Sequence, residues 1–430
     1  MYFVASINRL LKNPFVFAYS ALVFILPLVL SKETNELYEF PKTTFLYTFC
    51  ILLTGVFLSV LIYKPRRLKK VHLSVAVFLF SALISTLLSV HPSTSFFGYY
   101  TRFTDSLVFY AAMFALFYVA TNVLKSENFE TVFNFASAGS VILFFYALSQ
   151  YSGIFNFLWK GQLQDRVFST LGQPNWYAQY LVLLIGINFY KFLSKGSTVN
   201  LLFYGVQFVS LWLTFSMSGF AGFLALVVIN LFIVFRKKEI EIKRIVLLKR
   251  LALMAVIGVA TTFIFPGIFR QKLQDIFIDA QKVAQSAYVV HASSEEQSGN
   301  MISDPGYIRA GLWSGTMSLI TSSPKIFIFG TGPETFPYVF QKFRPAVLNY
   351  SSEWDFVLNK PHNYYLETWA EQGLIGVLSY FYLLLYVIKK SPQMYKSSLV
   401  AFAVTNIFGW PSVVPAVIFW IMVSSTEKEI

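Results

Sequence analysis

The residue best suited to chemistry in this sequence is His362, in the segment Pro361-His362-Asn363-Tyr364 that precedes an apolar run. An imidazole with an ordinary pKa of about 6.5 takes a proton from a hydroxyl group near neutral pH. A single histidine is more often structural, so its neighbours matter. Glu367 and Glu371 follow, and two interpretations stay open for them: one orients His362, or both are solvated at a membrane interface. His362 is the candidate general base.

Arginines supply the second chemical signal. Arg309 lies four residues before Trp313, and a planar guanidinium donates two hydrogen bonds to a phosphate group. Arg166 precedes the run Gly172-Gln173-Pro174-Asn175, and Arg102 follows two tyrosines. Arg166 and Arg102 either join a basic outer cleft or anchor the ends of spans among lipid headgroups. Arg309 either binds a phosphate group or is a surface cation on an exposed loop.

Metal ions and nucleotides receive little support. The four histidines include no closely spaced pair, and the single cysteine, Cys50, lies in an apolar run. No phosphate-binding glycine loop and no Gly-x-Ser-x-Gly motif is present. Some acidic residues have a spacing that suits a hard cation but is also common on solvated loops, namely Glu33, Glu36 and Glu39, and Glu353 with Asp355. We predict no metal, no cofactor and a substrate that is already activated.

The composition requires a membrane to position these residues. Hydrophobic residues make up 56% of the 430 positions and charged residues 13%, against about a quarter charged in soluble proteins. A net charge of +13 also suits nucleic acid, but the basic residues punctuate apolar runs and form no single patch. The sequence predicts a membrane protein without a nucleic-acid partner.

Twelve apolar windows contain no Asp, Glu, Lys or Arg and approach the length of about 20 residues that a span requires. They are 14–30, 43–63, 71–90, 106–122, 131–149, 174–190, 199–215, 219–235, 251–269, 373–388, 397–410 and 411–425. The last two are short, so a single broken hairpin around Pro411, and eleven spans, is the alternative. The predicted fold is an all-α polytopic membrane protein of about twelve transmembrane helices.

Loop charges predict the orientation. With the N-terminus inside, cytoplasmic segments hold 21 of the 34 Lys and Arg residues, and most of the remainder lie in one long loop that orientation rules count poorly. Both termini are therefore expected in the cytoplasm and the long loop outside the cytoplasmic (inner) membrane.

The chain divides into three parts within one integrated membrane domain: nine spans in 1–267, an extracytoplasmic loop in 268–361, and a re-entry helix with three spans in 362–430. The loop also carries Arg270 and Arg344. Apolar spacing predicts an amphipathic helix over 271–289 and a second over 306–321, the latter with one apolar side. That side consists of Ile308, Leu312, Met317 and Ile320. Gly330 and Gly332 then permit a sharp turn.

Several of these segments resemble the O-antigen ligase and O-antigen polymerase superfamily. The His362-Asn363 pair is followed, after nine residues, by Gly373-x-x-Gly376. Other similar segments are Phe329 to Phe336 with its Gly-x-Gly, the Arg309-x-x-x-Trp313 helix, Gly172-x-Pro174-Asn175, and Tyr38-Glu39-Phe40-Pro41-Lys42. The similarity runs through most of the chain in the same order.

The resemblance implies a metal-independent, membrane-embedded glycosyltransferase with a GT-C-like fold. Its donor is a glycan on a polyprenyl pyrophosphate, transferred with inversion to a hydroxyl of a lipid core, a glycan or a protein. Of these, the resemblance favours the ligase. By analogy Arg309 binds the pyrophosphate and His362 is the base. The implied substrate-binding residues are Arg102, Arg166, Asn175, Gly332, Asn363 and Glu367.

One motif departs from the family pattern. Where members carry an arginine between two small residues, this chain reads Ser216-Met217-Ser218-Gly219. Arg166 or Arg102 replaces the missing charge, or the member uses another donor or has reduced activity. A glycan transporter and a non-catalytic scaffold are the other function classes. A transporter is expected to carry ionisable residues inside its spans, and the twelve windows carry none.

Overall fold

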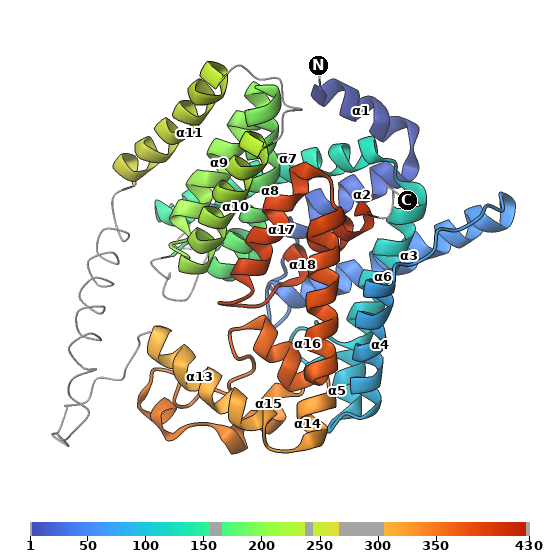
Figure 1. The fold of residues 1–430 in the computed structure, drawn as a ribbon, viewed down its shortest axis with the longest axis vertical. Helices are drawn as coiled ribbons and strands as arrows, with labels where there is room; N and C mark the ends of the chain where they lie inside the picture. The colour runs from blue at the N-terminus through green and yellow to red at the C-terminus, as the bar shows by residue number, and fades with distance from the viewer. Residues whose placement is uncertain (1, 155–165, 237–243, 266–304, 427–430) are drawn as a thin grey trace.

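The computed structural model describes residues 2–154, 166–236, 244–265 and 305–426. Within these ranges the chain is helical and contains no strand (Figure 1). Each of the twelve predicted windows overlaps a helix. These helices are α2 (Pro14–Ile25), α3 (Glu39–Tyr63), α4 (Leu73–Leu87), α6 (Leu107–Val123), α7 (Ser126–Tyr151), α8 (Pro174–Lys195), α9 (Thr198–Leu213), α10 (Met217–Arg236), α11 (Arg244–Ile264), α16 (Tyr364–Lys390), α17 (Gln393–Thr405) and α18 (Val413–Ser424).

Five of these helices are long and apolar enough to cross a membrane, namely α3, α7, α10, α11 and α16. A further five are apolar but shorter. The all-α, multi-pass membrane fold predicted from the sequence is therefore confirmed. Residues 406–412 separate α17 from α18 without regular helix, so the last two windows form two helices.

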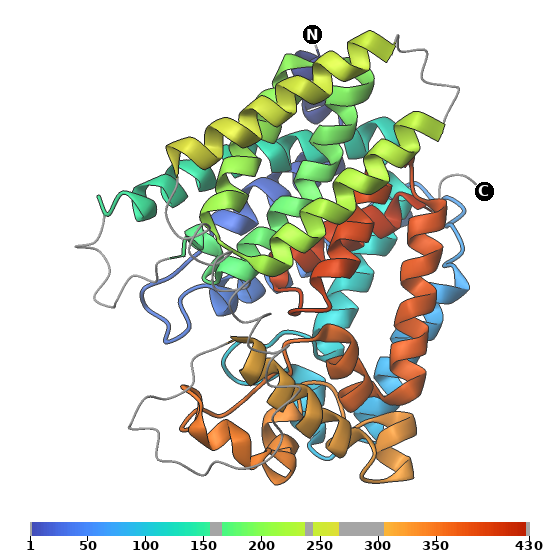
Figure 2. The same cartoon turned by 60° about the vertical axis from the view of Figure 1, so that its left-hand side comes forward.

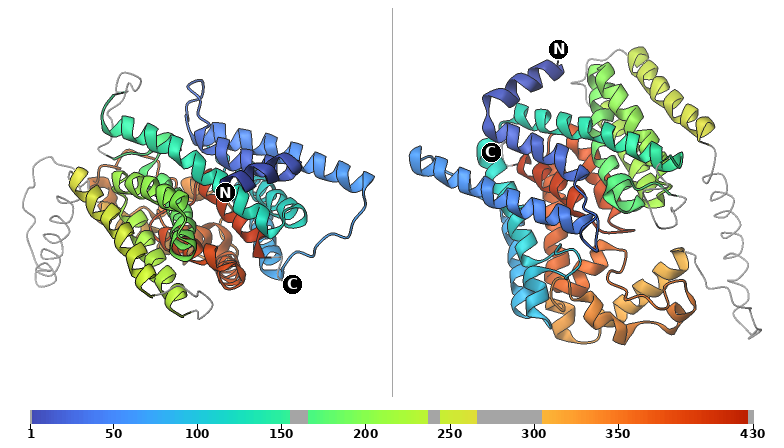
Figure 3. Two further views of the ribbon diagram at one scale, coloured as in Figure 1. Left: turned by 90° about the horizontal axis from the view of Figure 1, so that it is seen from above. Right: turned by 180° about the vertical axis from the view of Figure 1, so that it is seen from behind.

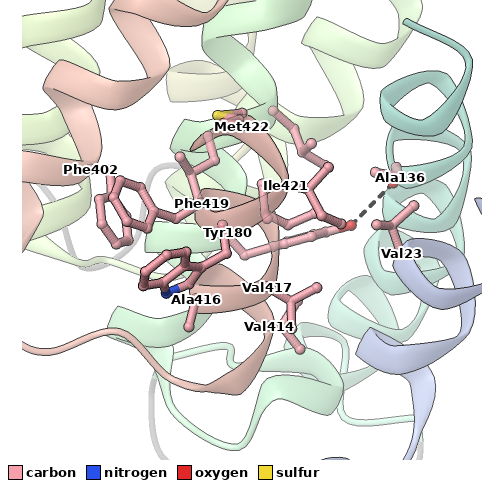
Figure 4. Packing of buried hydrophobic residues seen from close by; sticks show 14 of the residues in the cluster. Val23, Ala136, Tyr180, Phe402, Val414, Ala416, Val417, Phe419, Ile421 and Met422 are labelled. Carbon is pink, nitrogen blue, oxygen red and sulfur yellow. Dashed lines mark hydrogen bonds between the residues drawn. The ribbon is translucent and has the colours of Figure 1, made fainter. Parts of the chain in front are cut away.

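The bundle is built around α18, whose twelve residues are all buried. It packs against α6 and α8, and its apolar side chains surround Tyr180 of α8 (Figure 4). The Tyr180 hydroxyl donates a 3.1 Å hydrogen bond to the Ala136 carbonyl of α7, which satisfies the one polar atom of this side chain in an apolar core.

Exposed apolar side chains mark the flanks of the bundle. Seen from above, α3 and α11 lie on opposite sides (Figure 3), and both leave most of their surface uncovered by protein. Ile51, Ile62 and Phe263 are each more than 70% exposed. Such surfaces suit contact with lipid tails.

A second, smaller core forms at one end of the bundle. It is built by α13 (Pro305–Ile320), α14 (Pro324–Phe329), α15 (Phe336–Val339) and the short turns up to Tyr350. In Figures 1 and 2 this region lies at the bottom, opposite α1 (Tyr2–Lys12).

The second predicted loop helix corresponds to α13. Of the four residues predicted to share one side, Ile308, Leu312 and Ile320 are buried, whereas Met317 is 37% exposed and does not share their buried side. Met317 follows Leu312 by five residues, which places it about 140° away around a helix of 3.6 residues per turn. The helix predicted over 271–289, and Arg270 beside it, lie outside the described residues.

Helix α16 has two parts joined at Gly373, whose φ of 72° lies in the left-handed region. A β-carbon at Gly373 would overlap the Ile328 carbonyl, and one at Gly330 would overlap the Glu371 carbonyl. Both positions therefore require glycine. The first part packs Ala370 into the second core, and the second part runs into the bundle. This break couples the loop region to the membrane helices.

Candidate functional site

The predicted site residues converge where the bundle meets the second core. A narrow pocket there is bordered by His362, Asn175, Trp176, Ser218, Thr405 and Trp410, among others. The start of α16 is fixed to the segment between α17 and α18, because the Tyr364 N–H donates to the carbonyls of Asn406 and Gly409 at 2.9 and 3.0 Å. Segments far apart in sequence thus form one surface around His362.

Arg102 lies between two indole rings. Its guanidinium carbon is 5.1 Å from the ring centre of Trp176 and 6.0 Å from that of Trp410. Its Nε and Nη1 atoms are buried and donate no hydrogen bond within the described part of the chain. A cation held by aromatic faces with free donors is arranged to receive an anion.

Arg166 lies beside the segment that departs from the family pattern. Its Nε donates to the Thr214 carbonyl and its Nη2 to Asn175 Oδ1, both at 3.0 Å. Asn175 Oδ1 also accepts from the Ser216 hydroxyl at 2.8 Å. An arginine from another loop therefore supplies a charge directly beside Ser216-Met217-Ser218.

Arg309 is held near the same place by α13. One turn later on this helix, Trp313 Nε1 donates to the Pro361 carbonyl at 3.1 Å, which joins α13 to the His362 segment. The Arg309 charge is close enough to act on two neighbours. Burial and then Arg309 lower the pKa of Arg166 to about 10, and Arg309 also affects His362.

His362 is partly buried and adopts a left-handed backbone with φ of 55°. Its ring packs against that of Trp410 at a centroid distance of 5.0 Å. Burial, followed by the charges of Arg309 and Arg102, lowers the pKa of His362 to about 4. The imidazole is therefore uncharged at neutral pH, as a proton acceptor must be.

The other predicted binding residues have local partners. Asn363 caps α16, since its Oδ1 accepts from the Tyr365 and Leu366 N–H groups at 3.0 and 3.1 Å. Gly332 is buried in the turn before α15, and its N–H donates to the Glu371 carbonyl at 2.8 Å. These two residues shape the site, and neither offers the atom named above to a ligand.

Glu367 and Glu371 are both buried, so neither is the solvated interface residue that the sequence left open. Glu371 accepts the N–H groups of Glu334 and Phe336 at 2.9 and 3.1 Å. Glu367 forms an ion pair with Lys360, and neither carboxylate orients His362 through a described hydrogen bond.

Lys360 stands at the centre of a buried ionic cluster. Its ammonium contacts Glu334 at 2.5 Å, Asp105 at 3.2 Å and also Glu367. The three carboxylates lie close enough together to hold a metal ion by spacing alone. The ammonium occupies the position where such an ion would bind them, so Lys360 itself is the cation that the described carboxylates surround.

Other charged residues from the sequence analysis have structural roles. Arg344 donates to the carbonyls of Glu353 and Trp354, each at 2.9 Å, and so holds the loop rather than facing the pocket. Glu36 accepts the N–H of Phe40 at 2.7 Å, and Glu39 accepts that of Val413 at 2.9 Å. The two glutamates cap helices, which accounts for them without a cation.

Comparison with known proteins finds one matching family. The sequence model of one family, described as O-antigen ligase, matches residues 202–381, which include Arg309, Lys360 and His362. Residues 202–381 of the chain are therefore similar to the O-antigen ligase family. None of the curated proteins compared with it matches. The match supports, for this O-antigen ligase-like chain, a glycan-transfer role in envelope polysaccharide synthesis that uses a lipid-linked glycan donor and an acceptor.

Sequence reasoning missed part of this O-antigen ligase-like site. Trp176 and Trp410 form its aromatic walls, and the cluster of Lys360 with Asp105 and Glu334 lies behind it. One signal was present: Lys360 is two residues from His362 and Asp105 three from Arg102. In an apolar chain, charged residues this close to candidate site residues are themselves candidates for the site.

Proposed function

We propose that the protein transfers a glycan from a polyprenyl-pyrophosphate lipid to an acceptor hydroxyl at the outer face of the cytoplasmic membrane. Both termini lie in the cytoplasm in this proposal. The division into residues 1–267, 268–361 and 362–430 gives membrane helices, an extracytoplasmic loop and a membrane return. The opposite placement of α1 and α13 in Figure 1 supports this orientation.

The observation that carries the proposal is the gathering of arginines around one imidazole. Arg309 affects the pKa values of both Arg166 and His362, and Arg102 affects that of His362. Like charges brought together in a partly buried site repel one another unless an anion binds between them. A pyrophosphate carries the charge and the acceptor oxygens that this arrangement requires.

The chemistry follows from these groups. The uncharged His362 imidazole accepts the proton of the acceptor hydroxyl as its oxygen attacks the anomeric carbon. The bond from that carbon to the phosphate oxygen breaks, and the lipid pyrophosphate leaves with the bonding electrons. Arg309, Arg166 and Arg102 stabilise the charge on the departing group. A single displacement inverts the anomeric configuration, and arginines perform the charge stabilisation that metal ions perform in other transferases.

Three acceptors are compatible with this chemistry: a lipid core sugar, a second glycan repeat, or a protein hydroxyl. We favour the ligase, because the description of the matching family names that activity. A transporter is disfavoured, because the arginines and His362 lie at one end of the bundle beside the second core. Transporters place their substrate site near the membrane midplane.

The test is transfer by purified protein in proteoliposomes supplied with a polyprenyl-pyrophosphate glycan and each acceptor in turn. We expect product with wild-type protein and none above background with His362→Ala, since removal of a general base costs about 10² to 10⁴ in rate. Arg309→Lys should also be impaired, because an ammonium cannot donate the paired hydrogen bonds of a guanidinium. The anomeric configuration of the product, measured by NMR, tests inversion.

Arg66→Gln provides the control, because Arg66 is exposed on the loop between α3 and α4, in a segment assigned to the cytoplasm. Its activity should equal that of wild type. Full activity of His362→Ala would exclude the proposed base, and full activity of Arg309→Lys would exclude its pyrophosphate role. Transport of intact donor lipid without transfer would favour the flippase class.

A further inference from the structure

The buried cluster around Lys360 joins three separate segments of the chain. Asp105 precedes α6, Glu334 lies in the turn before α15, Lys360 precedes α16, and Glu367 is in α16. All four are at most 4% exposed. One ammonium therefore fixes the relative positions of segments that no regular hydrogen-bond ladder connects.

Backbone conformation points to the same place. Among the described residues, only six other than glycine have positive φ. Four of them belong to the segments joined by this cluster or lie beside it: Phe103 at 56°, Asp105 at 51°, Glu334 at 60° and His362 at 55°. Left-handed backbone is unfavourable for residues with a β-carbon and persists where surrounding contacts determine it. Lys360 pairs directly with Asp105 and Glu334, and it is two residues from His362.

Charge explains why the lysine matters. Burial lowers the pKa of Lys360, but Glu334, Glu367 and Asp105 outweigh burial and leave the pKa raised well above its ordinary value. The ammonium thus stays charged, and without it the carboxylates would be buried side by side. When their cation is removed, carboxylates buried side by side move apart or take up protons.

We infer that Lys360 is a positioning residue whose ammonium fixes the positions of His362 and Arg102 relative to each other. Asp105 is three residues from Arg102, and Lys360 is two residues from His362, so the ion pair between them links the base to one of the anion-binding groups. The inference rests on the proposed function, in which these two groups act on one substrate. Lys360 itself need not touch that substrate.

Its test uses Lys360→Met in the full-length protein, with a readout that requires no glycan. Diethyl pyrocarbonate modifies accessible uncharged imidazoles, and peptide mass spectrometry gives the rate at each histidine. We expect His362 to react several-fold faster than in wild type, while His72 at the start of α4 keeps its rate. In the transfer assay kcat should fall about 100-fold, the scale that a misplacement of about 1 Å produces.

Lys191→Met is the matched control. Lys191 is also buried and paired with a carboxylate, Glu130, at 3.2 Å, but it lies in α8 away from the site. Its loss should leave His362 reactivity and kcat unchanged. Equal acceleration at His362 and His72 in Lys360→Met, or the same effect from Lys191→Met, would overturn the inference, as would unchanged His362 reactivity.

If the Lys360→Met protein does not accumulate in cells, Lys360→Arg is tested in its place. It keeps the charge, but a planar guanidinium does not fit among three oxygen atoms that lie within 4.8 Å of one another. A selective rise in His362 reactivity is again expected, and wild-type reactivity together with wild-type kcat would overturn the inference. Wild-type protein inactive in transfer would refute the proposed function alone, because the modification rates stand independently.

Discussion

His362 combines an uncharged ring with cationic surroundings. Histidines in water are half protonated at a pH of about 6.5, whereas burial and two arginines lower the pKa of His362 to about 4. The side chain is therefore a weak base that is always unprotonated at physiological pH. Binding of an anion between the arginines would offset their charge and raise this pKa, so the donor itself strengthens the base.

The pH dependence of transfer tests this environment. Because protonation removes the base as the pH falls, kcat/KM for the donor should stay constant from about pH 8 to pH 5 and fall only near pH 4. The acid limb of kcat, which reports the donor complex, should lie at higher pH than that of kcat/KM. Both limbs come from initial rates in buffers of constant ionic strength.

Arg102→Gln is the matched variant for the pH profile. It removes one of the two charges that lower the pKa of His362, so the acid limb of kcat/KM should move upward. An acid limb of kcat/KM near the ordinary histidine value of about 6.5 in wild type would contradict the arrangement described here.

Among individual residues, the sequence revealed those histidine and arginine side chains that lie in polar segments. His362, Arg102, Arg166 and Arg309 were predicted as candidates. In the structure His362 borders the pocket and each arginine lies beside one of the pocket residues, although their roles stay predictions. Lys360 was missed because its importance depends on Asp105 and Glu334, two carboxylates from other segments of the chain. Pairing of that kind arises only from tertiary structure, which spacing along the chain does not encode.

The elements were more predictable than the residues. A hydrocarbon layer of about 30 Å requires long apolar helices. Because of this constraint, the twelve windows can be recognised in the sequence. Their ends were less predictable, since local contacts determine them. Helix α16 begins at Tyr364 and not near Gly373, because Asn363 caps it and the charged residues of its first part are buried in the second core.

The break at Gly373 provides a prediction for an element. Gly373→Ala places a β-carbon in left-handed backbone, which costs about 1–2 kcal/mol, and against the Ile328 carbonyl. We expect a lower midpoint of thermal unfolding in detergent and reduced transfer, because the first part of α16 positions the His362 segment.

Gly55→Ala is the control for Gly373→Ala. Gly55 lies within α3, and an added β-carbon there would meet no atom within 4 Å. Since alanine favours a helix over glycine by about 1 kcal/mol, its midpoint should be unchanged or higher. A Gly373→Ala protein as stable as Gly55→Ala would show that the break is not required.

The proposed orientation is a property of the whole molecule and is tested with cysteines. Cys50 is buried, so wild-type protein should show little labelling by a membrane-impermeant maleimide in intact cells. Ser352→Cys, exposed in the loop region, should be labelled from outside. Lys69→Cys, exposed between α3 and α4, should be labelled only after permeabilisation. The reverse pattern would invert the topology and place the site in the cytoplasm.

The burial of α18 has a consequence for biosynthesis. This helix fills the centre of the bundle, yet the ribosome produces it after all the other described helices. The earlier helices are therefore in the membrane before their central partner is synthesised, and their apolar faces contact lipid until then. Completion of the fold is a late event that follows translation of residue 413, so a nascent chain arrested before that residue has no finished interior.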